Sequence, residues 1–184
     1  IAVTEQATGE ISAGAGVGTN GSNISFAIKE NNFAGRGIQL ESNITISDDS
    51  IKGLPAYTEP KFRYSDRALS TSIQSTVTDK EAKSGYKSSL NKVSLGTSYE
   101  QFTDLFFSPS LSIASESLTT TSDASANYKK QEGSYMDALF RYGIVYDKRN
   151  SRCQPKSCYV SSWVQHLPIV SDDSAILNGY RLSG

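Results

Sequence analysis

The chain has 184 residues, with 18 basic and 19 acidic side chains and a formal net charge of −1. The charges are scattered, so no basic stripe predicts a nucleic-acid partner and no acidic tail predicts a solvated segment. Apolar runs such as Leu105–Phe107 last only three residues, whereas a membrane-spanning helix needs about 20. Composition therefore excludes a helical membrane protein. Ile1–Glu5 lacks the basic region and apolar core of a signal peptide, so we expect any targeting segment to lie upstream or to have been removed.

Alternation of apolar and polar residues is the main signal along the chain, and it predicts β-strands. The first predicted strand alternates Ile11, Ala13, Ala15 and Val17 with small residues, and a hairpin turn follows at Asn20-Gly21-Ser22. In chain order, the predicted strands cover residues 11–18, 24–29, 38–47, 52–64, 69–78, 86–101, 104–119, 136–146, 159–167 and 175–182. No segment has a helical period.

Two of these predicted elements need comment. The fourth strand, Lys52–Tyr64, contains Pro55 and Pro60, and proline inside a sheet marks a bulge or a strand end. A polar segment, Thr120–Ser134, separates the seventh strand from the eighth, and we expect it to be a long loop on the outer surface.

A soluble β-sandwich also alternates, and three features favour a transmembrane β-barrel instead. Many predicted strands have ten or more residues, whereas globular strands usually have about five or six. Their polar faces are rich in Ser, Thr, Asn and Gln, as a wet lumen requires. Aromatic residues gather near the predicted strand ends, where interfacial girdles lie: Tyr57, Phe62, Tyr64, Phe102, Phe106, Phe107, Tyr142, Tyr146 and Tyr159. We therefore predict an all-β, antiparallel up-and-down transmembrane barrel, here a partial barrel of about nine to ten strands.

Other motifs in the sequence predict no chemistry. Gly16–Gly21 fits a dinucleotide fingerprint by spacing, but no helix follows it, so a hairpin is the better interpretation. The single histidine, His166, lies in a predicted strand, and serines are too abundant for a triad to mean anything. We expect no enzymatic activity, no catalytic residue, no metal site and no cofactor.

Cys153 and Cys158 flank a predicted turn, Gln154–Ser157. In an oxidising compartment these two cysteines can form a disulfide across the hairpin, whereas in the cytosol they would be free thiols. The sequence does not fix the geometry that would decide between the two states.

Four stretches resemble the BamA family of outer-membrane protein assembly factors, also called the bacterial surface antigen family. They are Thr8–Gly16, Glu30–Gly37, Tyr57–Phe62, and Tyr146–Asn150 followed by Gln154-Pro155. In that family they correspond to the junction between the last periplasmic POTRA module and the barrel, the second turn, the fourth strand, and the turn after the eighth strand. The chain is thus similar to the N-terminal half of the barrel domain.

The chain also departs from the family pattern. Ala7 stands where a proline is usual, and Lys156-Ser157-Cys158 replaces a Thr-Asp-Gly turn, so the cysteine pair is interpreted as a replacement brace. The resemblance implies a barrel of about sixteen strands, with the POTRA modules before Ile1 and the closing strands, together with a Val-Arg-Gly-Phe loop motif, after Gly184. Residues 1–8 are expected to end the last POTRA module, and residues 9–184 to form the first part of the barrel.

The resemblance implies a function without covalent chemistry: folding and inserting outer-membrane proteins in the bacterial outer membrane. The first strand would act as a lateral gate that pairs with an incoming strand. The residues are Glu10, Ile11, Ser12, Ala13, Gly14, Ala15, Gly16, Val17, Gly18 and Thr19. The glycines would loosen this strand, or they would only relieve crowding inside the barrel.

The implied partners are nascent outer-membrane proteins, membrane lipid and accessory lipoproteins that bind the missing POTRA modules. Two other functions stay open: a passive pore or two-partner secretion transporter of the same superfamily, and a soluble β-sandwich binding protein.

Overall fold

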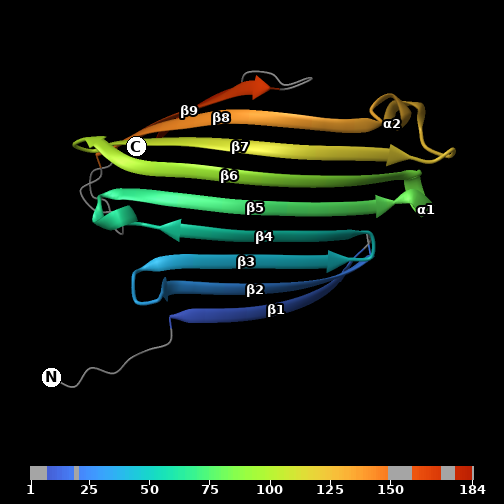
Figure 1. Ribbon diagram of the computed structural model, residues 1–184, viewed down its shortest axis with the longest axis horizontal. Helices are drawn as coiled ribbons and strands as arrows, with labels where there is room; N and C mark the ends of the chain where they lie inside the picture. Colours follow the sequence, from blue (N-terminus) through green and yellow to red (C-terminus); the bar gives the residue numbers. More distant parts are fainter. Residues whose placement is uncertain (1–7, 19–20, 149–158, 171–176, 184) are drawn as a thin grey trace.

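The computed structural model describes residues 8–18, 21–148, 159–170 and 177–183 as one long, curved sheet (Figure 1). Its strands are β1 (Gly9–Gly18), β2 (Gly21–Phe33), β3 (Ile38–Ser47), β4 (Ser50–Glu59), β5 (Arg67–Lys80), β6 (Tyr86–Phe102), β7 (Leu105–Thr120), β8 (Gly133–Asp147), β9 (Val160–Val170) and β10 (Leu177–Ser183). Among the described residues, no helix is long and apolar enough to cross a membrane.

The strands follow one another across the sheet in sequence order, β1 to β10, and every neighbouring pair is antiparallel. Each strand contacts the strand before it and the strand after it, as in an up-and-down meander. The predicted all-β, antiparallel, partial barrel is confirmed: over the described residues the sheet is open, with β1 at one edge and β10 at the other.

Only one layer is present in the described part of the chain, so the sheet has no second sheet to pack against. Among the described residues, Ile38 and Ala124 are the only buried hydrophobic residues, and Glu59 is the only buried charged residue. Ile44, Ile73 and Phe140 lie on one open face instead of meeting in a closed core. A β-sandwich buries two inner faces against each other, so the sandwich alternative is wrong for this fold.

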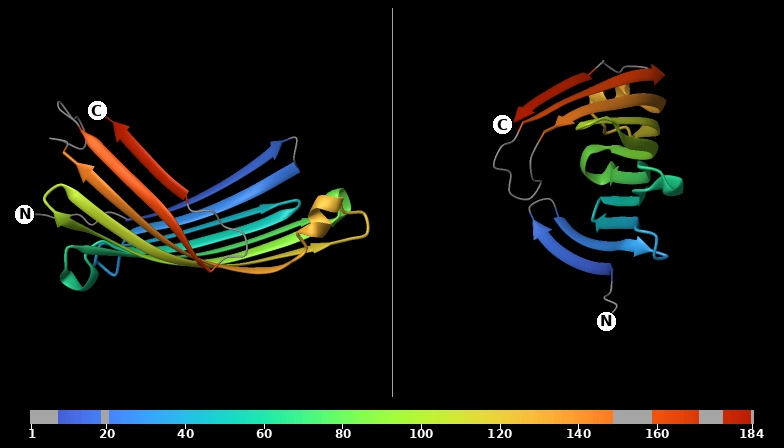
Figure 2. Two further views of the ribbon diagram at one scale, coloured as in Figure 1. Left: turned by 90° about the horizontal axis from the view of Figure 1, so that it is seen from above. Right: turned by 90° about the vertical axis from the view of Figure 1, so that its left-hand side faces the viewer.

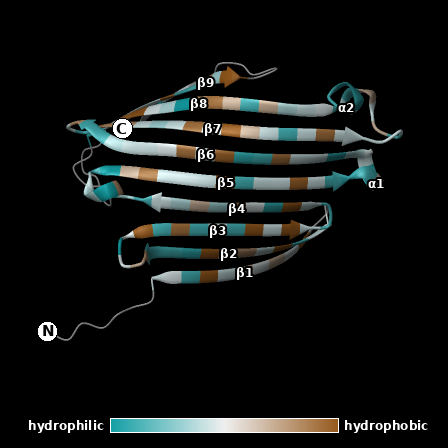
Figure 3. Cartoon of the chain, in the orientation of Figure 1, coloured by the Kyte–Doolittle hydropathy of each residue, from teal (hydrophilic) through white to brown (hydrophobic). Residues whose placement is uncertain are grey.

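The two faces of the sheet differ in both polarity and curvature. Side chains alternate between the faces, which produces the hydropathy stripes along each strand in Figure 3. A hollow of about 300 Å³ on the polar face touches residues from β4 to β9, and only the inside of a curved sheet brings so many strands around one space. The polar face is therefore concave and the apolar face convex, and Figure 2 shows the curvature that separates them.

The two ends of the strands also differ. The start of β1 and the connection η1 (Phe62–Tyr64) lie at one end, which we call the N-terminal end. The short helices α1 (Glu81–Ser84) and α2 (Ala126–Lys130) lie at the opposite, helical end (Figure 1). The loop predicted over Thr120–Ser134 is shorter in the structure. β7 ends at Thr120, β8 begins at Gly133, and α2 lies between them.

The predicted fourth strand is too long at its C-terminus. β4 ends at Glu59 because Pro60 has no N–H to donate to the ladder, and a 3₁₀ turn follows over Phe62–Tyr64. Arg63 and Tyr64 have φ angles of 51° and 62°, which lie in the left-handed region and not in the β region. Phe62 and Tyr64 thus belong to a turn and not to a strand.

Candidate functional site: the free edge of β1

The predicted gate strand, β1, lies at the edge of the sheet and pairs only with β2 among the described strands. The pairing runs from Gly9 opposite Glu30 to Gly18 opposite Gly21 without a bulge. Nine of the predicted gate residues, Glu10 to Gly18, therefore belong to one regular edge strand. Thr19 lies outside the described residues.

The direction of the backbone groups in β1 follows from one hydrogen bond. The amide of Asn31 donates to the carbonyl of Thr8 at 3.2 Å, so Thr8 directs its backbone groups toward β2. Because these directions alternate in an antiparallel ladder, the even-numbered residues of β1 bond to β2 and the odd-numbered residues face away. The open edge therefore presents the N–H and C=O groups of Gly9, Ile11, Ala13, Ala15 and Val17.

The side chains of β1 leave this edge uncovered. Ile11 and Val17 are 79% and 92% exposed on the convex face, and only the small Ala13 and Ala15 lie between them. Long charged side chains usually protect an exposed edge strand, and β1 carries a single charge, Glu10, on the concave face. This edge is thus chemically suited to accept another strand.

Gly14 and Gly16 of β1 lie on the concave face, opposite side chains of β2. A methyl group at Gly14 would lie 3.1 Å from Ser25 Oγ, and one at Gly16 would lie 3.2 Å from Asn23 Oδ1. Both distances are tight, but both neighbours are the ends of side chains and not backbone. The glycines therefore relieve crowding, and they also leave the strand with little side-chain packing. The geometry is compatible with both interpretations from the sequence.

A polar cluster at the N-terminal end holds the β2–β3 turn against β4. Its residues were not among the site residues predicted from the sequence. Arg36, in the β2–β3 turn, forms a salt bridge of 2.9 Å with Glu59 at the end of β4, and the Tyr57 hydroxyl donates to the same carboxylate at 2.9 Å. Glu59 is 7% exposed, so both partners satisfy a buried charge. Arg36 and Glu59 lie in two of the stretches that carry the family resemblance, and that coincidence was the available signal.

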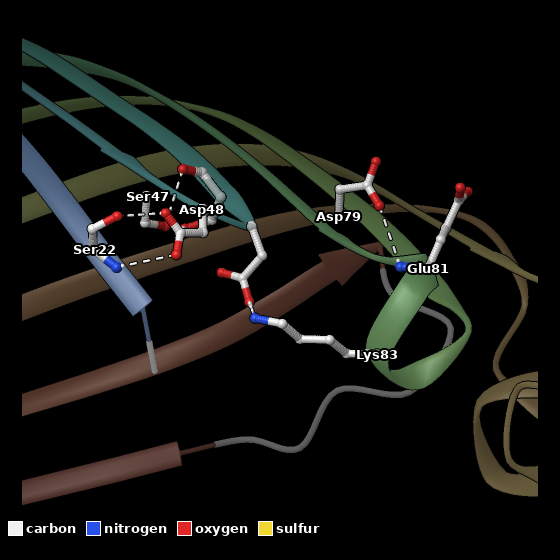
Figure 4. Close-up of polar contacts among 8 residues, drawn as sticks. Ser22, Ser47, Asp48, Asp79, Glu81 and Lys83 are labelled. Carbon is white, nitrogen blue, oxygen red and sulfur yellow. Dashed lines mark hydrogen bonds and ion pairs between the residues drawn. The ribbon is translucent and has the colours of Figure 1, made fainter. Parts of the chain in front are cut away.

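At the helical end, a second set of contacts holds the start of β2 (Figure 4). Ser22 donates to the Asp48 carboxylate twice, from its amide at 3.1 Å and from its hydroxyl at 2.6 Å. These bonds lower the pKa of Asp48, and the Lys83 charge adds a smaller effect. Gly21 has a φ of 112° and lies against this carboxylate, so no side chain fits there. Contacts thus hold β2 at both ends, whereas β1 pairs with β2 alone among the described strands.

Farther from the edge, the convex face carries a row of aromatic side chains across neighbouring strands. Tyr99 contacts Phe107 edge-on with ring centroids 5.9 Å apart, and Tyr142 lies 6.2 Å from both Phe107 and Trp163. The predicted gathering of aromatics near strand ends is present at this N-terminal end. Phe106 also lies near a strand end, but the register places it on the opposite face from Phe107.

The hollow on the concave face is lined by small and hydroxyl side chains together with basic groups. Ser70, Ser72, Ser94 and Ser110 are among its lining residues, and Lys92, Arg141 and His166 also line it. Within the described ranges, no three His, Cys, Asp or Glu side chains gather as a metal site would require. Cys153 and Cys158 lie outside the described residues, so their pairing stays a prediction.

Comparison with known proteins identifies the family. The Omp85 superfamily domain matches residues 32–178, which is more than half of the chain, and no curated protein matches. The crystal structure of BamA from Haemophilus ducreyi lacking POTRA domains 1–3 is similar in fold, with a TM-score of 0.63 at 21% identity. The match covers 90% of this chain and 35% of that chain, so the chain spans about a third of it. The chain belongs to the Omp85 superfamily, and its sheet has the fold of part of a BamA barrel.

Proposed function

We propose that this chain is the N-terminal part of an outer-membrane barrel that folds and inserts other outer-membrane proteins, with β1 as the lateral gate. The observation that carries the proposal is that β1, among the described strands, has a neighbour on one side only. β1 directs the backbone groups of alternate residues, Gly9 to Val17, away from the sheet. An unpaired row of this kind binds an extended segment by β-augmentation.

The contrast between the faces supports a membrane location. Exposed Ile, Val, Leu and aromatic side chains on the convex face suit contact with lipid, and the serine-rich concave face suits a wet lumen. With the chain oriented as the family resemblance implies, the N-terminal end faces the periplasm and the helical end faces outward. Residues 1–8 then continue from a POTRA module, and residues 9–184 form barrel.

The partners follow from the same proposal. Nascent outer-membrane proteins would supply the pairing strand, lipid would surround the convex face, and accessory lipoproteins would bind POTRA modules outside this chain. Pairing of strands exchanges hydrogen bonds and forms no covalent bond, so the proposed activity is not enzymatic. The proposed compartment is the bacterial outer membrane.

Cross-linking from β1 tests this function directly. In the full-length protein with Cys153 and Cys158 replaced by serine, we expect Ser12→Cys and Ala15→Cys to form disulfides with a cysteine in the terminal strand of a substrate caught during insertion. The matched control is Ala27→Cys in β2, because Ala27 pairs with Ser12 on one side and Asn43 on the other. Equal cross-linking at Ala27, or insertion without any cross-link at β1, would contradict the proposal.

A passive pore or a two-partner secretion transporter of the same superfamily is the second candidate. The serine-rich hollow of the concave face favours it, because such a surface lines a conduit for water or for an extended peptide. The two functions separate in one experiment. A transporter would release its passenger protein across the membrane without cross-links at β1, and a pore would show steady ion conductance that blocking the β1 edge does not change.

A further inference from the structure

The η1 turn has an unusual position and shape. It projects from the convex side of the sheet at the N-terminal end (Figure 2). At its tip, Arg63 and Tyr64 are consecutive non-glycine residues in the left-handed region, with φ angles of 51° and 62°. Such a conformation costs about 1 kcal/mol or more per residue and persists only where the surroundings hold it.

Hydrogen bonds in the turn hold this conformation. The Ser65 hydroxyl donates to the carbonyl of Phe62 at 2.6 Å, and its oxygen accepts from the amide of Arg67 at 3.3 Å. The amide of Tyr64 donates to the carbonyl of Lys61 at 3.0 Å. As a result Tyr64 is 95% exposed, the largest exposed fraction among the large apolar and aromatic side chains described. The turn therefore holds an aromatic ring away from the rest of the protein.

Three basic residues lie in the turn or directly after it. Lys61 and Arg63 lie in the turn, and Arg67 follows at the first position of β5, on the convex face. Within the described residues, the ion pairs of the structure involve Arg36, Lys83 and Lys87, and none of the three cations around η1. The nearest acidic residue in sequence is Asp66, so the turn has an excess of positive charge.

The row of aromatics continues from this turn along the membrane-facing side. The guanidinium carbon of Arg67 lies 5.0 Å from the Tyr99 ring centroid, and that of Arg63 lies 5.6 Å from the Phe62 ring centroid. Tyr99 in turn contacts Phe107, the next ring in the row. Aromatic belts mark the level of lipid headgroups, and cations at that level face the headgroup phosphates.

We infer that the η1 turn is a binding site for the phosphate of an anionic phospholipid headgroup, with Lys61, Arg63 and Arg67 as its cationic groups and Tyr64 as its interfacial anchor. The inference rests on the proposed membrane location and not on the gate role of β1. It adds a lipid-specific contact at the edge of the membrane that the general apolar surface does not provide.

The test compares two triple variants of the full-length protein in detergent. One is Lys61→Gln, Arg63→Gln and Arg67→Gln; the control, Lys29→Gln, Lys52→Gln and Lys92→Gln, removes the same charge from the concave face. Native mass spectrometry during titration with short-chain phosphatidylglycerol or phosphatidylcholine gives the Kd for each lipid. We expect the η1 variant to bind phosphatidylglycerol about five-fold more weakly or worse, with phosphatidylcholine unchanged. The control variant should bind both lipids as the parent does.

Other outcomes overturn the inference. If the η1 variant keeps its preference for phosphatidylglycerol, or if the control loses it equally, the turn is not the site. If inorganic phosphate displaces the lipid at the same concentration, the site belongs to free phosphate and not to a headgroup. Heat-modifiable migration in gels confirms that each variant is folded. Insertion by β1 is measured separately, so a failed gate with intact lipid preference refutes only the gate.

Discussion

Strands β1 and β6 have the same alternating pattern, but they differ in length, in the number of neighbouring strands and in the size of their side chains. β1 has 10 residues, one neighbour and small residues at most positions. β6 has 17 residues, pairs with β5 and β7 along most of its length, and contributes Tyr99 to the aromatic row. Removing β6 would break two ladders, whereas adding a strand to the outer edge of β1 would break none of the described ladders.

This difference supports the proposed gate role for β1 and not for an inner strand such as β6. The salt bridge of Arg36 with Glu59 and the hydrogen bonds of Ser22 with Asp48 hold the two ends of β2. These contacts involve no residue of β1. A template strand must be held in place and still have a free edge. Among the described strands, β1 is bonded along its inner edge to β2 and along its outer edge to none, as the proposed role requires.

A substitution that disrupts the inner strand β6 should produce the largest effect. Leu95 lies in the middle of β6, opposite Thr71 in β5 and Leu111 in β7. Leu95→Pro removes a ladder N–H and should cost about 3 kcal/mol or more, so we expect no folded barrel. Heat-modifiable migration and far-UV circular dichroism measure this. Leu95→Ala should fold, because its side chain is half exposed and its N–H remains.

Proline should be tolerated by the fold at Ala15 of β1 but not at the neighbouring Gly14. The N–H of Ala15 points to the open edge, so Ala15→Pro should leave the barrel folded and reduce insertion of substrates about tenfold. Gly14 bonds to β2 opposite Ser25, so Gly14→Pro should weaken the β1–β2 ladder and lower folding yield. Normal insertion by a folded Ala15→Pro variant would contradict the template role.

A milder pair of variants separates the two interpretations of the glycines. Gly14→Ala places a methyl group against Ser25 Oγ, and adding Ser25→Ala removes the contact. If the glycines loosen β1, the double variant should fold well and insert substrates about two- to five-fold more slowly. The reason is that replacing Gly with Ala stabilises the paired strand by about 0.5–1 kcal/mol. If they only relieve crowding, the double variant should insert at the parental rate. Insertion kinetics into vesicles decide between the two.

The smallest expected effect concerns the contact that anchors β2. Hydrogen bonds from Ser22 lower the pKa of Asp48, so the folded state favours the ionised carboxylate. A lowered pKa contributes stability above the ordinary pKa of the carboxylate, and that stability is lost as the pH falls through the folded-state pKa. We expect Asp48→Asn to reduce stability slightly at neutral pH and not at strongly acidic pH. Urea unfolding at both pH values measures the difference, and an equal loss at both would contradict the assignment.

Most of the fold could be predicted from the sequence because an up-and-down sheet uses only local information. Each strand alternates with period two, each pairs with the next, and the turn residues between them are visible as Asn, Gly, Asp and Ser. The predicted strands therefore agree closely with β1–β10. The errors fall where local patterns are weak: α1 and α2 have four and five residues, which is too short for a helical period, and η1 follows a proline inside an apparent strand.

The candidate site was predictable in part. The sequence and the family resemblance pointed to Glu10–Thr19, and the structure describes nine of these residues as an edge strand. Which residues present their backbone to the open edge depends on the register with β2, and a sequence does not contain that register. The Arg36–Glu59 ion pair joins residues 23 apart in the sequence, so only the pairing of β3 with β4 brings them together.

The sequence by itself determined the class of the sheet, the order of its strands and the division into polar and apolar faces, because alternation is a property of neighbouring residues. Only the tertiary structure decided which end carries the projecting η1 turn and which backbone groups of β1 face away from β2. Those features depend on twist and register, which arise when distant strands bond to one another.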